Sequence, residues 1–323
     1  MQKSAVVILL LTTLLSGCNQ PESNAEQQLQ LADSSVLSGE LSNDASLALL
    51  GSASQGAVLW DLPRKTPRFR WHTDKDDEPV TVTRFSPASG WAVTASATTF
   101  ALWQTRDGKS AGYYSLPESR LRDIAVADNG HQVVIAREDG KSEWVDLQSG
   151  RRLQFLGHSE AVNSVDLSPN GRYALSGGND YAAYLWDTQS GQVLHRFNHG
   201  SRVALVRLDP AGRYAFTASA MGQAVIWDLV SGKQVSQLQM KHRQEIYSTA
   251  RFVNQGKWLL TGSPSRQAEL WQVSDGALLA SWQVAIREQH RPAGAVVYGV
   301  ALRDNNRVVT LSSSGYAETW SIK

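Results

Sequence analysis

The sequence predicts an all-β protein, a seven-bladed β-propeller in which each blade is a four-stranded antiparallel sheet. Seven short strings that contain tryptophan recur at intervals of 41 to 49 residues, and glycine-containing turns keep the same interval. The segments between the turns are short and rich in β-forming residues, as strands are. One blade cannot bury both of its faces, so we expect the repeats to stack around an axis.

The repeated tryptophans set the number of blades. Their strings include LWD (59–61), LWD (185–187) and IWD (226–228). Turns such as SPNG (168–171) precede the next tryptophan by 13 to 15 residues, and turns such as QSG (189–191) follow it. Turns this frequent exclude a helical solenoid of similar period. The seven tryptophans are Trp60, Trp103, Trp144, Trp186, Trp227, Trp271 and Trp320.

The two ends of the sequence predict how the ring closes. Only three residues follow Trp320, so the seventh repeat lacks an outermost strand. Residues 27–31 are similar to residues 236–240, which we assign to the outer strand of the fifth repeat. We therefore expect residues 27–32 to pair with residues 316–322, which would remove an open sheet edge.

Composition narrows the function. The 323 residues include 31 basic and 30 acidic side chains, a balance that argues against a generic nucleic-acid binder. A single cysteine excludes an intramolecular disulfide and a cysteine-rich metal site. The sequence has no HExxH, phosphate-loop or GxSxG motif, so we expect no catalytic residues, metal or cofactor.

Residues 1–17 have the features of a secretory signal. Lys3 precedes an uncharged run of eleven residues, 5–15, which is too short for a bilayer core of about 30 Å and fits a secretory signal. The following Leu15-Ser16-Gly17-Cys18 resembles the lipobox of bacterial lipoproteins, whose cysteine becomes the lipidated first residue. The alternative, a cleaved signal of a soluble protein, would leave an unpaired thiol in an oxidising compartment.

The lipobox resemblance implies acyl chains, palmitate among them, on Cys18. By the same resemblance, Asn19 rather than aspartate after the cysteine favours the outer membrane over the inner membrane, with the protein on the periplasmic face. Residues 18–27 would be the lipidated N-terminus and tether, and residues 28–323 the propeller. The nine residues 19–27 reach about 30 Å when extended, so the propeller would stay close to the membrane.

The fourth repeat resembles the WD-repeat β-propeller family, and the likeness extends from about residue 28 to the end. The resemblance implies a buried network in which Asp180 holds His158, which bonds Ser176, which bonds the Trp186 indole. A nucleophilic triad is not expected, because no oxyanion-hole signature accompanies these residues. The matching positions are Gly157-His158, Ser168-Pro169-Asn170-Gly171, Ser176, Asp180 and Leu185-Trp186-Asp187.

The other repeats lack aspartate at the matching position, so we expect the complete network in one blade only and simple packing elsewhere.

The innermost strands should line the central channel. Blade order makes Glu40–Arg84 and Asp166–Arg207 neighbours, and we predict two interblade ion pairs, or else an anion site that uses Arg207 and Arg251. The channel positions are Glu40, Arg84, Ala125, Asp166, Arg207, Arg251 and Ala301.

Loops that join one blade to the next share one face and are candidate partner-binding loops. The loop at 286–295 is several residues longer than its equivalents. Residues 74–78 have acids at alternating positions, as calcium loops do, but Pro79 stands where such a loop requires glycine. The candidate residues are Asp74, Asp76, Asp77, Glu78, Lys241, Arg243, Arg287, His290 and Arg291.

These features favour a membrane-anchored, non-enzymatic scaffold for protein–protein interaction in the bacterial envelope. We expect an unidentified protein or peptide partner, membrane contact through the lipid, and no nucleic acid. The alternative is a propeller enzyme or small-ligand binder with a site at the channel mouth. A quinone-cofactor propeller ranks third, because the Trp-Asp strings are typical of a different propeller family.

Overall fold

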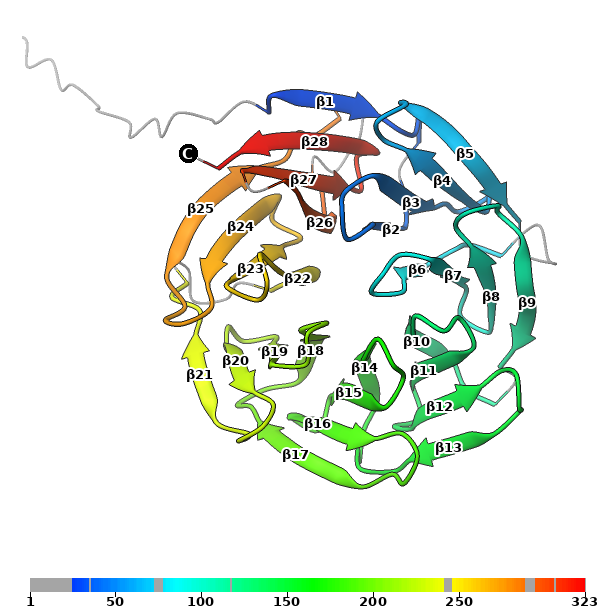
Figure 1. The fold of residues 1–323 in the computed structure, drawn as a ribbon, viewed down its shortest axis with the longest axis vertical. Helices are drawn as coiled ribbons and strands as arrows, with labels where there is room; N and C mark the ends of the chain where they lie inside the picture. Colours follow the sequence, from blue (N-terminus) through cyan, green and yellow to red (C-terminus); the bar gives the residue numbers. More distant parts are fainter. Residues whose placement is uncertain are drawn as a thin grey trace, which may run out of the picture.

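The chain forms a ring of seven four-stranded antiparallel sheets (Figure 1). The computed structural model describes residues 25–34, 36–72, 78–116, 118–240, 246–287, 294–304 and 306–322. The predicted seven-bladed β-propeller is confirmed. Across these described ranges, no helix is long and apolar enough to cross a membrane. The predicted signal peptide and Cys18 lie outside the described residues.

Blades 1 to 4 follow the chain from the inside of the ring outward. Blade 1 is β2 (Ser38–Leu41), β3 (Leu47–Gly51), β4 (Ala57–Asp61) and β5 (Thr66–Trp71). Blade 2 is β6 (Val82–Phe85), β7 (Trp91–Ala95), β8 (Thr99–Gln104) and β9 (Ser110–Ser115). Blade 3 is β10 (Leu121–Val126), β11 (Gln132–Arg137), β12 (Ser142–Asp146) and β13 (Arg152–Phe155). Blade 4 is β14 (Val162–Leu167), β15 (Tyr173–Gly178), β16 (Ala182–Asp187) and β17 (Val193–Asn198).

Blades 5 and 6 repeat this order, and blade 7 takes its outer strand from the N-terminal segment. Blade 5 is β18 (Val203–Leu208), β19 (Tyr214–Ser219), β20 (Ala224–Asp228) and β21 (Gln234–Gln237). Blade 6 is β22 (Thr249–Val253), β23 (Trp258–Gly262), β24 (Gln267–Gln272) and β25 (Leu278–Gln283). Blade 7 is β26 (Val297–Asp304), β27 (Arg307–Ser312), β28 (Tyr316–Ser321) and β1 (Gln27–Gln30).

The predicted ring closure is confirmed. β1 pairs antiparallel with β28, with Gln27 opposite Thr319 and Gln30 opposite Tyr316. Figure 1 shows the blue β1 lying along the outside of the red β28. Leu29 packs on the core between blades 7 and 1, so the closing strand adds apolar contact as well as hydrogen bonds.

Aromatic rings join neighbouring blades. Each repeated tryptophan lies on the third strand of its blade. Trp103 of blade 2 stacks on Trp71 of blade 1, with ring centroids 4.9 Å apart. Trp186 of blade 4 stacks on Phe155 of blade 3 at 4.8 Å. Such stacks bury large apolar surfaces between sheets, which explains why the tryptophans recur once per blade.

The ring has two different faces. One face, here called the loop face, carries the connections between blades and the turns between second and third strands. The opposite face, here called the turn face, carries the remaining hairpin turns. The turn face depends on glycine: Gly171 and Gly191 have φ angles of 71° and 74°, a left-handed conformation that glycine adopts without steric cost.

Ring closure gives a first prediction. A chain that lacks residues 1–33 loses β1 and exposes the edge of β28, so we expect a lower melting temperature and concentration-dependent aggregation. The matched control lacks only residues 1–24 and keeps β1. Thermal unfolding measures the melting temperature of each chain, and light scattering measures its aggregation. Equal melting temperatures and equal aggregation would contradict the proposed role of β1.

Candidate functional site

The innermost strands enclose a cavity of about 70 Å³ at the mouth of the channel on the turn face. Charged side chains dominate its polar lining. Six of the seven predicted channel positions line this cavity, and Ala301 is not among the lining residues. The six are Glu40, Arg84, Ala125, Asp166, Arg207 and Arg251.

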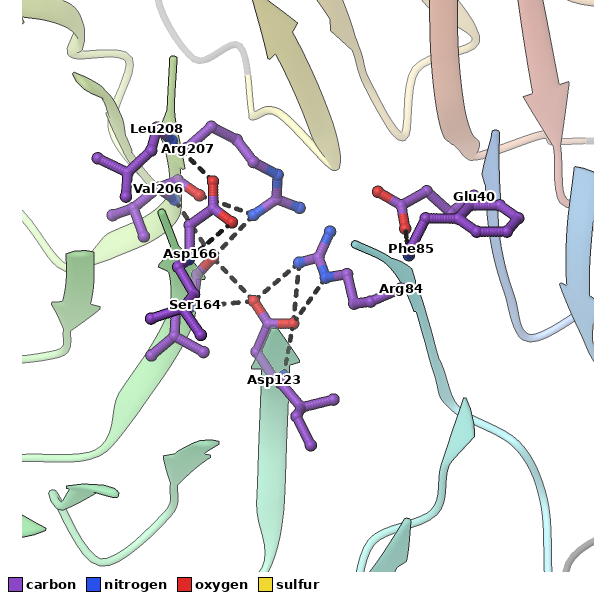
Figure 2. Close-up of polar contacts among 12 residues, drawn as sticks. Glu40, Arg84, Phe85, Asp123, Ser164, Asp166, Val206, Arg207 and Leu208 are labelled. Carbon is purple, nitrogen blue, oxygen red and sulfur yellow. Dashed lines mark hydrogen bonds and ion pairs between the residues drawn. The ribbon is translucent and has the colours of Figure 1, made fainter. Parts of the chain in front are cut away.

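Asp123 of β10 links three blades. Its carboxylate accepts hydrogen bonds from the Arg84 guanidinium of blade 2 at 2.8 Å. It also accepts the Ser164 hydroxyl at 3.0 Å and the Val165 N–H at 3.1 Å, both from blade 4. Figure 2 shows Asp123 at the centre of these contacts. The Asp123 side chain is buried, so these donors replace its lost hydration.

Two further carboxylates make the same kind of link. Glu40 of blade 1 accepts the backbone N–H of Phe85 in blade 2. Asp166 of blade 4 accepts the backbone N–H of Leu208 in blade 5 at 2.7 Å. Thus three acids on inner strands each bond a backbone N–H of the next blade, which fixes neighbouring blades relative to one another.

The prediction of the two ion pairs is wrong, because the charged residues of the channel have other partners. Neither Glu40–Arg84 nor Asp166–Arg207 is among the ion pairs of the described residues. The observed pairs are Arg84–Asp123 at 2.8 Å and Arg251–Glu40 at 3.4 Å, the second across blade 7. The physical reason is that Glu40 and Asp166 accept backbone N–H groups of the next strand, which leaves the neighbouring guanidinium groups to find other acceptors.

Burial and neighbouring charges shift the pKa values of this cluster. Burial lowers the pKa of Arg84, but Asp123 and Glu40 outweigh this effect and raise it above its ordinary value. Burial raises the pKa of Asp166, although Arg207 opposes the shift. Burial, and then the like charge of Arg84, lower the pKa of Arg207 to about 10, so Arg207 stays charged at neutral pH.

In blade 4 the structure places His158, Ser176, Asp180 and Trp186 in one chain of contacts. His158 Nδ1 lies 2.9 Å from an Asp180 carboxylate oxygen, and His158 Nε2 lies 2.9 Å from the Ser176 hydroxyl. The Trp186 indole N–H donates to the same hydroxyl at 3.3 Å. The network connects the loop between blades 3 and 4 with two strands of blade 4.

Other blades keep part of this arrangement, which the sequence analysis assigned to packing alone. In four blades a threonine hydroxyl accepts the tryptophan N–H, at 2.7 to 3.0 Å. Trp60 and Trp144 have Leu50 and Ala136 at that position, and their indole nitrogens have no hydrogen-bond partner among the described residues. The four threonines are Thr94, Thr217, Thr261 and Thr310.

Blade 5 has the histidine but not the acid. His199 Nε2 lies 2.8 Å from the Thr217 hydroxyl, as His158 does from Ser176. Met221 occupies the position of Asp180, and the buried His199 Nδ1 has no hydrogen-bond partner in the part of the chain that the structure describes. Burial lowers the pKa of His199 to about 4, so the ring is neutral at pH 7.

Most predicted loop residues lie outside the described residues: Asp74, Asp76, Asp77, Lys241, Arg243, His290 and Arg291. The two that are described contact their own protein. Glu78 accepts hydrogen bonds from the hydroxyl groups of Ser96 and Thr99. Arg287 donates to the Ala32 carbonyl and lies 5.7 Å from the Tyr316 ring centre.

The loop face carries apolar side chains that the sequence analysis missed. Leu156, Tyr181 and Met221 are 70%, 54% and 67% exposed. Tyr181 and Met221 occupy equivalent turns in blades 4 and 5. A signal was available: Tyr181 and Met221 each lie in a turn where the neighbouring repeats have small or polar residues. Within the described ranges, no group of three or more His, Cys, Asp or Glu side chains could hold a metal ion.

Comparisons with known proteins agree with this geometry. Residues 150–187 match the WD40 family model (WD domain, G-beta repeat), and they contain β13 to β16. The chain is 29% identical over 143 residues to WD repeat-containing protein SL1-17 of Schistosoma mansoni, covering 44% of this chain and 46% of that protein. It is 30% identical over 145 residues to autophagy-related protein 16 of Arabidopsis thaliana, covering 44% and 28%. It is 25% identical over 132 residues to pre-mRNA-processing factor 19 of Caenorhabditis elegans, covering 39% and 26%.

The chain thus spans less than half the length of each of these relatives. The matched model is one repeat long, and it falls on the repeat whose His158 network is complete. Together with the seven-bladed ring, the matches support a WD-repeat β-propeller.

The Asp123 link can be tested by substitution. Asp123→Asn keeps the size of the side chain but leaves the buried Arg84 charge without a carboxylate. We expect a loss of about 3–5 kcal/mol in the free energy of unfolding, measured by urea denaturation. The control, Asp304→Asn, breaks the exposed Asp304–Arg307 pair and should leave stability nearly unchanged. Similar effects of the two substitutions would contradict the central role of Asp123.

His199 predicts a pH dependence. The unfolded chain takes up a proton on this ring below about pH 6.5, whereas the folded protein does so only near pH 4. The contribution of the neutral His199 ring to stability is therefore fully present above pH 6.5. The free energy of unfolding falls by about 3 kcal/mol as the pH drops to about 4. Met221→Asp supplies the missing acceptor and should flatten this fall. Urea denaturation between pH 7 and pH 4 measures the free energy of unfolding of both proteins. Identical pH profiles would refute the assignment of this fall to His199.

Proposed function

We propose that the protein is a non-enzymatic protein-interaction scaffold that binds a partner through its loop face. We further propose that a lipid on Cys18 anchors it to the periplasmic side of a bacterial outer membrane. The observation that carries the first proposal is the set of exposed apolar side chains Leu156, Tyr181 and Met221 on one face of a rigid ring. Similarity to WD-repeat proteins supports a protein-interaction scaffold in general.

The backbone beneath these side chains is fixed by hydrogen bonds. The Tyr181 carbonyl accepts the N–H of His199, and the Met221 N–H donates to the Ser201 hydroxyl at 3.1 Å. Both contacts join a turn to the connection between blades 4 and 5. Apolar side chains on a preorganised backbone lose little conformational entropy on binding, which favours them as anchors for a partner.

The topology also supports a free loop face in an anchored protein. β1 enters the ring with Gln27 opposite Thr319, near the end of β28 that lies on the turn face. A tether that precedes Gln27 would therefore leave from the turn-face side of blade 7. The loop face would then be directed away from the point of attachment, where a partner can reach it.

The loop-face proposal is tested by crosslinking in membrane envelopes followed by mass spectrometry. Tyr181→Asn, which suits the left-handed φ of 63° at this position, combined with Met221→Lys should reduce capture of the dominant partner at least tenfold. Leu279→Lys, at a half-exposed position on β25 of blade 6, is the control and should leave capture unchanged. Undiminished capture by the loop-face variant at an unchanged melting temperature would contradict the proposal.

The anchor is tested separately. Cys18→Ser removes the site of acylation, so we expect loss of palmitate labelling and release of the protein from the membrane fraction. Cell fractionation and labelling with radioactive palmitate measure these effects. A Cys18→Ser protein that stays in the membrane fraction would count against the lipid anchor without affecting the loop-face proposal.

A further inference from the structure

A groove of about 440 Å³ lies on the turn face between blades 4 and 5. Three of its lining side chains are large, apolar and exposed: Tyr173 at 41%, Leu194 at 40% and Val230 at 86%. Exposed apolar side chains that gather around a groove mark an interaction site. The acid on its wall, Asp209, is paired with Arg213 at 3.1 Å, so the groove presents no free negative charge from that residue.

Arg207 lies at the channel mouth next to this groove. Its side chain is buried, with 8% of the residue exposed. Its Nη1 donates to the Val206 carbonyl at 2.7 Å and to the Ser164 hydroxyl at 3.4 Å. In the part of the chain that the structure describes, Arg207 forms no ion pair, and its Nε and Nη2 have no hydrogen-bond acceptor. Figure 2 shows the guanidinium projecting from its strand toward the interior of the channel.

Asp166, the acid on the inner strand of the preceding blade, forms no ion pair with Arg207. Asp166 faces the same cavity, but one of its oxygens accepts the Leu167 N–H and the other accepts the Leu208 N–H. Arg84 and Arg251, in contrast, each have a carboxylate partner. Among the described channel arginines, Arg207 is therefore the one without a carboxylate partner, and its Nε and Nη2 can donate to an external acceptor.

The groove and the channel mouth are continuous. Pro169, Leu208 and Pro210 line both of them. Prolines have no backbone N–H, so the shared wall is apolar. A ligand can therefore place apolar groups between blades 4 and 5 and extend an anionic end to Arg207.

We propose that the turn face binds the C-terminus of a partner polypeptide, with apolar residues in the groove and the terminal carboxylate on Arg207. A guanidinium matches a carboxylate in charge and in bidentate geometry. The channel-mouth cavity of about 70 Å³ is much smaller than the groove of about 440 Å³, which favours a chain end over a continuing chain at Arg207. The groove is open, so an extended peptide would cover it, whereas a small molecule would stay exposed. This site is separate from the loop face and does not rest on that proposal.

Fluorescence anisotropy tests the proposal with the full chain and a fluorescein-labelled peptide, Gly-Ala-Leu-Leu-Val. We expect the free-acid peptide to bind at least tenfold more tightly than the same peptide with a C-terminal amide. Arg207→Met should remove this preference. Leu194→Lys should weaken binding of the free-acid peptide at least tenfold.

Val193→Lys is the matched control, because Val193 is 43% exposed on the same strand but does not line the groove. It should leave the affinity unchanged, and so should the loop-face variant of Tyr181 and Met221. Equal affinities of acid and amide, equal effects of Leu194→Lys and Val193→Lys, or octanoate that binds as tightly as the peptide would overturn the proposal. If Arg207→Met does not fold, the comparison of the free-acid and amidated peptides and the exposed Leu194→Lys variant still test the proposal.

Discussion

The structure depends on carboxylates at the channel, buried or partly buried, that reach from one blade to the next. A propeller blade is a complete sheet, and apolar contact alone holds neighbouring sheets together without fixing their separation at the axis. Asp123, Glu40 and Asp166 solve this problem, because each accepts a backbone N–H of the following blade. A carboxylate without such donors would be costly to bury, so the network stabilises only the arrangement in which every acid is satisfied.

The same arrangement explains why the two faces of the ring can have different functions. The inner strands and the tryptophan contacts fix the backbone, so side chains at the turns and loops can vary without loss of the fold. On the loop face, apolar side chains stand on backbone tied by His199 and Ser201. On the turn face, Arg207 is the described channel arginine that forms no ion pair, and it lies beside an apolar groove. The proposed binding sites therefore rest on a common rigid frame.

Much of the fold could be predicted from the sequence, because the tryptophan that recurs once per repeat packs between neighbouring blades and so gives the number of blades. The channel-lining positions could also be predicted, since side chains alternate along a strand. Their partners could not: a bulge between Leu121 and Asp123 changes the register of β10, and whether an acid meets a guanidinium or a backbone N–H depends on such local geometry. The groove around Leu194 could not be predicted because it forms where blades 4 and 5 meet in space, whereas the turn that holds Tyr181 did carry a signal in the sequence.

Amide hydrogen exchange at Phe85, Val165 and Leu208 tests the central claim most directly, because these are the N–H groups that the three carboxylates accept. If the acids hold the blades together, these amides exchange only when the whole ring unfolds, at the rate of the most protected strand amides. Exchange as fast as that of hairpin-turn amides at the same pH would contradict the account, because it would mean that neighbouring blades separate at the axis while the rest of the fold stays intact.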